Sequence, residues 1–163
     1  MAAHLFRRYS DRVPFWLIKH LVNLCPPFMG AGIKVIEAEK DFTFLKVELK
    51  RKWFNSNYVG TQFGGSIYAM VDPFYMLMLM NILGKNYIVW DKAAKIQFLK
   101  PGRSRLTAEF KVSNDLIENV KKRTERGEKY VFDLPVEIHD DEGTLIAHVS
   151  KTMYVRKKRQ HPN

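Results

Sequence analysis

The sequence predicts an α+β fold in which an antiparallel sheet wraps around one long central helix. Two observations support this fold class. Residues 67–83 form the most apolar run of the chain, and apolar side chains cover nearly every side of the helix expected over residues 64–83, as in a buried helix. The segments before and after this stretch alternate between apolar and polar residues, which is typical of strands that are buried on one face.

An extra N-terminal helix is expected to begin at Ser10 or Asp11 and to end near Leu24. Its apolar residues recur at helical spacing: Val13, Trp16, Leu17, Leu21 and Leu24. The prolines at 26–27 and Gly30 are expected to end it. We therefore expect an N-terminal helical segment over residues 1–29.

Six strands are predicted from alternation: residues 32–39, 42–52, 87–98, 106–112, 130–138 and 144–155. Simple alternation in the third strand places Trp90 and Ile96 on one face and Asp91 on the other face, beside Lys95. An exposed ion pair is therefore the default interpretation of Asp91. Residues 114–127 are polar and charged, and we expect a connection that contains some helix.

Length and composition indicate one main domain, over residues 30–156, followed by a basic tail at 157–163. The chain has 163 residues, of which 46% are hydrophobic, and a net charge of +10. A single cysteine and the lack of an evident signal peptide favour the cytoplasm. Asp72 and Pro73 interrupt the apolar run, so we expect no stable membrane insertion. Basic tails are usually solvated, and nucleic-acid binding is not expected.

The most informative segment is residues 55–72, NSNYVGTQFGGSIYAMVD. Gly64 and Gly65 open the apolar helix and leave free amides there, which favour an anion or a polarised carbonyl oxygen. Asp72 lies seven residues past Gly65, about two helical turns further on. Amides that bind an electrophile, with a carboxylate behind them, are consistent with acyl transfer.

Each of these residues also has a plain structural explanation. Asp72 before Pro73 could be the N-cap of a helix that restarts after a break near Val71, and we weigh this role evenly against that of a base. Asn57 could be only a turn residue. The methionines of the helix are better explained by core packing than by an acyl-chain pocket: Met70, Met76, Met78 and Met80.

Several other functional classes lack their motifs in this sequence. No two histidines have metal-ligand spacing with a carboxylate, so we expect no metal and no other cofactor. There is no Gly-x-Ser-x-Gly elbow, no phosphate-binding loop and no dinucleotide fingerprint.

The order of elements, together with this motif, resembles the hotdog fold. Within that fold the chain resembles the thioesterase superfamily on the side of the phenylacetyl-CoA-type enzymes, and in particular the uncharacterised DUF4442 group. The thioesterase pattern has Asn, Gly three residues later, His-Gly-Gly, and Asp nine residues after the His. Phe63 stands at the His position, and the other positions match: Asn57, Gly60, Gly64, Gly65 and Asp72.

The resemblance implies an acyl-CoA thioesterase that also needs no cofactor. Gly64, with Gly65 beside it, would polarise the thioester carbonyl, Asp72 would be the general base or nucleophile, and Asn57 would order the loop or the water. Further residues are expected to bind the substrate: Gly60, Thr61, Gln62, Phe63, Ser66, Lys100 and Arg103. For Lys100 and Arg103 a solvated turn is the default interpretation, and contact with the phosphates of CoA is the functional alternative.

The resemblance also implies a homodimer with the site between subunits, and a dimer of dimers. The substrate would be an acyl-CoA or an acyl-carrier thioester. Because Phe63 removes the polar side chain of the motif, the alternative is a protein that binds acyl-CoA or a fatty acyl group without turnover.

Overall fold

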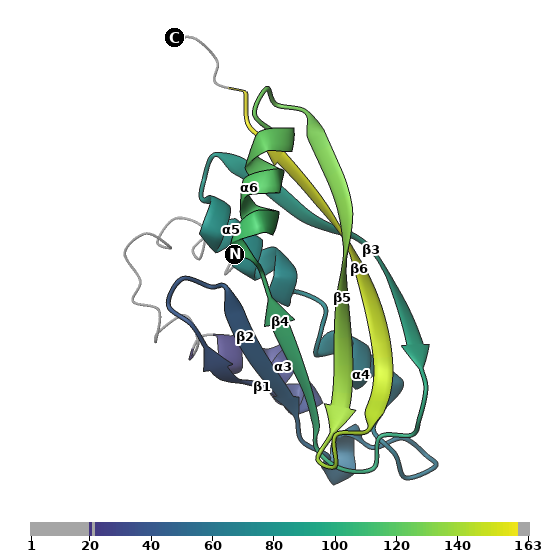
Figure 1. Ribbon diagram of the computed structural model, residues 1–163. Coiled ribbons are helices and arrows are strands. Elements are labelled where there is room, and N and C mark those ends of the chain that lie inside the picture. The colour runs from purple at the N-terminus through teal and green to yellow at the C-terminus, as the bar shows by residue number, and fades with distance from the viewer. Residues whose placement is uncertain (1–19, 21, 160–163) are drawn as a thin grey trace.

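The computed structural model describes residues 20 and 22–159, which form one sheet with helices against it (Figure 1). The strands are β1 (Ile33–Ala38), β2 (Phe44–Leu49), β3 (Tyr87–Phe98), β4 (Leu106–Lys111), β5 (Lys129–Asp140) and β6 (Leu145–Lys157). The helices are α3 (Pro26–Ala31), α4 (Gly64–Ala69), α5 (Phe74–Leu83) and α6 (Asn114–Arg123), with a 3₁₀ turn, η1 (Trp53–Asn55). The sheet order is β1-β2-β4-β5-β6-β3, and every neighbouring pair is antiparallel.

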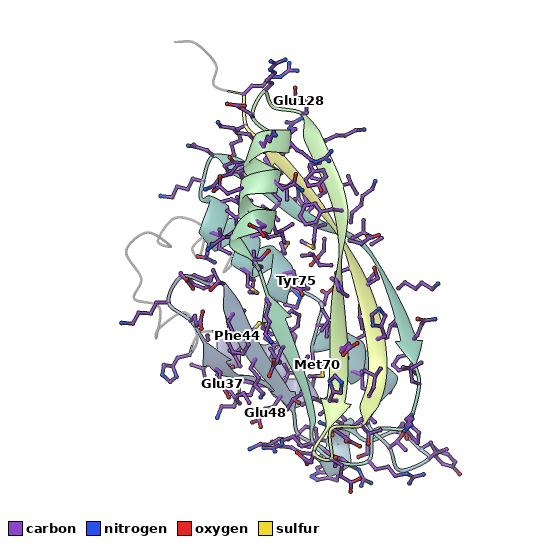
Figure 2. The ribbon with its side chains drawn as sticks, viewed as in Figure 1. Glu37, Phe44, Glu48, Met70, Tyr75 and Glu128 are labelled. Atoms are coloured by element: carbon purple, nitrogen blue, oxygen red, sulfur yellow. The ribbon has the colours of Figure 1, made fainter. Side chains whose placement is uncertain are left out.

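The sheet curves around α4 and α5, and the core lies between them (Figure 1). Figure 2 shows Met70 and Tyr75 in this layer, where both are buried. Met78 is buried as well, while Met76 and Met80 pack half-buried against the core. The predicted fold class is therefore confirmed, and core packing accounts for the methionines.

The central helix consists of two helices with a short turn between them. α4 ends at Ala69 and α5 begins at Phe74. Pro73 has no amide to donate and disfavours helical geometry at the preceding Asp72, so the helix breaks there. Residues 64–83 are long and apolar enough to cross a membrane by composition, with a mean hydropathy of 1.4, but they are the core helices of this fold.

A β-bulge in β3 overturns the predicted faces of that strand. Pairing with β6 shifts register between Asp91 and Ala93. Trp90 pairs with Tyr154, whereas Asp91 pairs with the buried Met153. The extra residue reverses alternation, so Asp91 shares the inner face with Ile96 and Trp90 lies on the outer face. The prediction that Asp91 is exposed beside Lys95 was wrong.

The N-terminal helix predicted from Ser10 or Asp11 to near Leu24 falls mostly outside the described residues. His20, Val22 and Asn23 are helical, and the helix stops at Leu24 as expected. The side chain of Asn23 is bonded to β1, because its Oδ1 accepts from the amide of Val35 at 2.7 Å. The proline pair at 26–27 also begins a new helix, α3, a role that the sequence analysis missed.

The connection between β4 and β5 contains α6, as predicted. Ser113 caps this helix, and its Oγ accepts from the amide of Leu116 at 3.2 Å. Ile117 and Val120 point into the core. This helix lies at the opposite end of the sheet from α4 (Figure 1), which makes its exposed residues suitable controls for the site.

Candidate active site

Asn57 organises the loop that precedes α4. Its Oδ1 accepts from the amide of Thr61 at 2.9 Å, and its Nδ2 donates to the Thr61 hydroxyl at 2.8 Å. The Asn57 amide donates to the Thr61 carbonyl at 2.7 Å, and Gly60 closes the turn by donating to the Asn57 carbonyl. These bonds fit the turn role of Asn57, because its side chain holds the loop in one shape.

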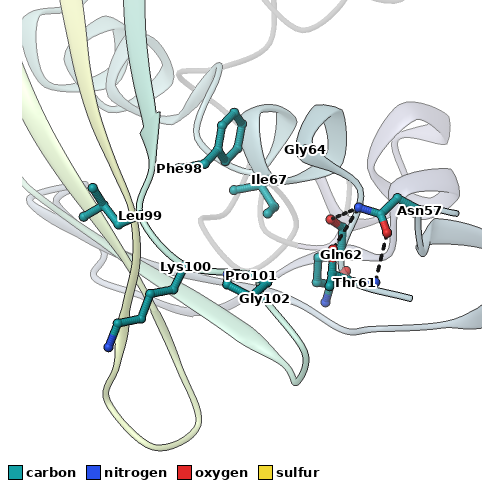
Figure 3. Close-up of a pocket in the computed structure, with 10 residues that line it drawn as sticks. All are labelled: Asn57, Thr61, Gln62, Gly64, Ile67, Phe98, Leu99, Lys100, Pro101 and Gly102. Carbon is teal, nitrogen blue, oxygen red and sulfur yellow. Dashed lines mark hydrogen bonds between the residues drawn. The ribbon is translucent and has the colours of Figure 1, made fainter. Parts of the chain in front are cut away.

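The loop, the start of α4 and the end of β3 surround a pocket of about 330 Å³ (Figure 3). Its lining residues are Asn57, Thr61, Gln62, Gly64, Ile67, Phe98, Leu99, Lys100, Pro101 and Gly102. The structure thus brings together some of the residues expected in the site: Asn57, Thr61, Gln62, Gly64 and Lys100. The remaining ones do not line this pocket: Gly60, Phe63, Gly65, Ser66, Asp72 and Arg103.

Neither the Gly64 amide nor the Gly65 amide donates to any residue in the described part of the chain, and of the two residues Gly64 lines the pocket. The ring of Phe63 closes over Gly65, and a β-carbon there would collide with the ring. Ser66 is buried, and its amide donates to the Phe63 carbonyl. Within this segment, Gly64 presents its backbone to the pocket.

Gln62, which lines the pocket, holds its side-chain amide in a fixed orientation. Its Nε2 donates to the carbonyls of Leu49 at 3.2 Å and Ser104 at 3.1 Å, which determines the orientation of the amide. The Oε1 atom is buried and receives no hydrogen bond from the residues that the structure describes. A buried acceptor of this kind is costly unless water or a ligand donates to it.

Asp72 lies in the turn between α4 and α5, and it does not cap α5. Pro73 occupies the N-cap position, and α5 has no side-chain cap. The helix-cap explanation of Asp72 was therefore wrong. Instead, Oδ1 of Asp72 accepts from the Tyr68 hydroxyl at 3.2 Å and from Nζ of Lys151 at 3.0 Å. The side chain stays 51% exposed.

Lys151 is an ionisable residue of this region that the sequence analysis missed, and Asp91 is one that it placed on the wrong face of β3. Nζ of Lys151 lies 3.4 Å from Oδ1 of Asp91. Burial raises the pKa of Asp91, although Lys151 opposes this. Burial lowers the pKa of Lys151, but the hydrogen bond to Asp72 and the charges of both carboxylates outweigh it, so its pKa is raised. A signal was present, because alternation places Lys151 among apolar residues of β6.

A second hollow, of about 400 Å³, lies near the pocket and is strongly basic. Its lining residues are Arg51, Lys52, Trp53, Ser56 and Arg103. Nη1 of Arg51 donates to the Arg103 carbonyl at 3.2 Å, which joins the two sides of the hollow. The indole of Trp53 is 90% exposed. Arg103 thus lies beside the pocket rather than in it.

Among the residues that the structure describes, no group of three or more His, Cys, Asp or Glu side chains could hold a metal ion. The groups of this region that can donate or accept a proton or a hydrogen bond include backbone amides, carboxylates, a lysine and a tyrosine hydroxyl.

The chain belongs to the DUF4442 family, a domain of unknown function, whose model matches residues 15–155. No curated protein matches the chain.

Solved structures with the same fold cover most of this chain. The Pseudomonas aeruginosa protein PA5026, of unknown function and described as a probable thioesterase, has a TM-score of 0.78 at 17% identity and covers 89% of this chain and 97% of its own. The Haemophilus influenzae thioesterase HI1161 has a TM-score of 0.62 at 15% identity, covering 90% and 92%. The E. coli PaaI protein, from the phenylacetic acid degradation operon, has a TM-score of 0.59 at 17% identity, covering 89% and 93%.

At these identities the likeness concerns the fold alone, and it confirms the hotdog fold that the sequence predicted. Activity has to be argued from the residues of this chain.

Proposed function

We propose that the protein is a thioesterase that hydrolyses acyl-CoA. The observation that carries this proposal is the pocket lined by Gly64, whose amide donates to no described residue, beside a loop held by Asn57. An amide in that position can donate to the carbonyl oxygen of a thioester and hold the oxyanion that forms when the carbonyl carbon is attacked. The thioesterase descriptions of proteins with this fold support the same reaction class.

In the proposed reaction, Asp72 acts as the general base. The carboxylate takes a proton from water as the water oxygen bonds to the thioester carbon. The carbonyl oxygen becomes an oxyanion that the Gly64 amide, with Gly65 beside it, stabilises. When the C–S bond breaks, the proton passes from Asp72 to the thiolate, and the products are a carboxylic acid and free CoA.

Asp72 does not line the pocket that Gly64 lines, so these two residues of one chain do not face the same thioester there. The proposed site therefore takes Gly64 from one copy and Asp72 from another. β3 is an edge strand with Trp90 and Phe98 exposed, which suits pairing between two copies. A dimer of dimers would be the larger assembly.

The basic hollow favours CoA as the carrier. Arg51, Lys52 and Arg103 can contact phosphates, and the exposed Trp53 ring can stack on adenine. Lys100, which lines the pocket, would add a further positive charge to this region. An acyl-pantetheine lacks the nucleotide, so it would lose these contacts and keep those of the pocket.

The first test is hydrolysis of acetyl-, octanoyl-, palmitoyl- and phenylacetyl-CoA by wild type and Asp72→Asn. Asp115→Asn, an exposed carboxylate on α6, is the matched control. We expect turnover by wild type and control and a loss of at least about 100-fold in Asp72→Asn, as for a general base. Turnover that survives Asp72→Asn would exclude this role of Asp72.

The carrier is tested with Arg103→Ala and the control Lys122→Ala on α6. KM for acyl-CoA should rise in Arg103→Ala, while KM for the matching acyl-pantetheine stays at its wild-type value. Equal effects on both substrates would argue against a nucleotide in the hollow.

One observation favours a second candidate function, an acyl-CoA binding protein without turnover. Phe63 replaces the polar residue of the thioesterase motif, and its exposed ring covers Gly65. If wild type hydrolyses no acyl-CoA but binds one saturably in calorimetry, this alternative replaces the thioesterase. The single cysteine supports the cytoplasm as the compartment for either function.

A further inference from the structure

Lys151 is a buried cation on a strand face that is otherwise apolar. It lies on the inner face of β6 with the buried Val149 and Met153. Its side chain is 1% exposed. Because an ammonium group loses its hydration on burial, such a lysine persists only where other groups replace that hydration.

The replacement comes from three side chains of three different segments. Nζ lies 3.0 Å from Oδ1 of Asp72, in the turn after α4, and 3.4 Å from Oδ1 of Asp91 on β3. It also lies 5.5 Å from the ring centre of Tyr68 on α4. The Tyr68 hydroxyl donates to Oδ1 of Asp72. Lys151 thereby links the helix break to the bulged part of the edge strand.

The charges of this cluster do not cancel. Two carboxylates face one ammonium, and their attraction keeps the pKa of Lys151 raised in spite of burial. The cluster therefore has an excess negative charge. Asp91 is the more buried of the two carboxylates, so Asp72 is the carboxylate of the cluster that is exposed to solvent.

The two oxygens of Asp72 have different surroundings. Tyr68 and Lys151 both donate to Oδ1. Oδ2 accepts no hydrogen bond from the described residues, on a side chain that is half exposed. One oxygen is thus anchored from two directions, which limits rotation of the carboxylate, and the other is free to accept a proton.

We propose that Lys151 and Tyr68 are positioning residues that hold Oδ1 of Asp72, so that Oδ2 is presented to the water that attacks the thioester. This assignment rests on the proposed thioesterase function and adds to it the groups that orient the base. A carboxylate held in this way needs no reorganisation before proton transfer.

The test compares Lys151→Gln, which removes the charge, with Tyr68→Phe, which removes only the hydroxyl and keeps the ring. Lys122→Gln on α6, an exposed lysine far from the cluster, is the matched control. Circular dichroism first establishes which variants fold. We expect kcat for an acyl-CoA to fall by about 100-fold in Lys151→Gln, with KM nearly unchanged, because binding at Gly64 is intact. In Tyr68→Phe, kcat should also fall, but by less than in Lys151→Gln.

A second readout does not depend on turnover. Lys151 lowers the pKa of Asp91, so Lys151→Gln should raise the Asp91 pKa further in a carboxyl ¹³C NMR titration assigned with Asp91→Asn. An Asp91 titration unchanged in Lys151→Gln would overturn the ion cluster itself. If Lys151→Gln does not fold, Tyr68→Phe becomes the test. A kcat of Tyr68→Phe equal to that of wild type would then overturn the positioning role.

The failures of the two proposals differ. If the wild-type protein hydrolyses no acyl-CoA, the proposed thioesterase function is overturned, and the positioning role is overturned with it. Wild type with turnover, together with Lys151→Gln at wild-type kcat, would overturn the positioning role alone. If KM rises in Lys151→Gln while kcat stays at its wild-type value, Lys151 contributes to substrate binding, and the positioning role is overturned.

Discussion

The ring of Phe98 on β3 lies against the backbone of Gly64 at the start of α4, so that a β-carbon on Gly64 would be 3.3 Å from Cζ of Phe98. Both residues line the pocket. The contact joins the edge strand to the first turn of the central helix. The width of the pocket is therefore set by two elements that are distant in sequence.

Phe98→Ala should widen the pocket and shift its preference toward bulkier acyl groups. The substitution removes an aromatic ring from a wall that Ile67 and Leu99 otherwise form. We expect the ratio of kcat/KM for palmitoyl-CoA to that for acetyl-CoA to rise by about 10-fold. The control is Val131→Ala, an exposed apolar residue of β5. Identical chain-length profiles for the variant and wild type would contradict the assignment of this wall.

Asn55→Ala should destabilise the fold more than Asn57→Ala does. Asn55 is buried, and its Nδ2 donates to the carbonyls of Ala31 at 2.8 Å and Lys50 at 2.7 Å. Its Oδ1 accepts from the Lys52 amide at 2.7 Å. Leaving these groups unpaired should lower the free energy of unfolding by about 2–3 kcal/mol. Urea denaturation measures it, and equal losses for both variants would refute the ranking.

Gly32→Ala and Gly30→Ala should have opposite effects on stability. Gly32 has φ +80°, and a β-carbon there would lie 2.6 Å from Nδ2 of Asn55. We expect a loss of about 1–3 kcal/mol. Gly30 lies inside α3, where a β-carbon would meet nothing within 4 Å. Alanine there should increase stability by about 0.5–1 kcal/mol. Thermal unfolding of both variants tests the pair, and two losses would contradict the helical geometry at Gly30.

Asp91→Asn should gain stability relative to wild type as the pH rises. Burial raises the pKa of Asp91 in the folded state, so its protonated form favours folding. That contribution is complete below the unfolded pKa of about 3.8 and is lost as the pH rises through the folded pKa. Asparagine does not titrate, so the difference in free energy of unfolding should move in its favour above about pH 4. Denaturation between pH 3 and pH 8 measures this trend.

Asp41→Asn is the control of opposite sign. The Thr43 amide and hydroxyl donate to Asp41 and lower its pKa. Its stabilising contribution is present above the unfolded pKa and is lost as the pH falls through the folded pKa. The difference in free energy of unfolding between Asp41→Asn and wild type should therefore move in favour of wild type as the pH rises. The same trend in both aspartate variants would show that a global effect, rather than Asp91, controls the pH dependence.

Local patterns predicted most of the fold correctly. Alternation in β4 placed Leu106, Ala108 and Phe110 on one face, and all three are buried. The glycine pair at 64–65 begins α4 as expected. These features depend on neighbouring residues alone, because strand alternation and helix starts follow from backbone geometry.

The errors arose where pairing between distant segments changed the local pattern. The bulge after Asp91 depends on register with β6, and alternation could not reveal it. The separation of Asp72 from the pocket depends on the length of α4 and its position against β3. Lys151 could have been noticed as a lysine at an apolar position, but its partners belong to segments far away in the chain.

Sequence patterns were enough to predict the strands, the buried central segment and the glycine start of α4, since these follow from the period of apolar residues and from backbone conformations. Which ionisable groups meet depends instead on the tertiary fold. Asp72, Asp91 and Lys151 come together because a bulge reversed one strand face and a proline broke one helix. The free energy of burying a charge depends on partners that chain neighbours do not supply.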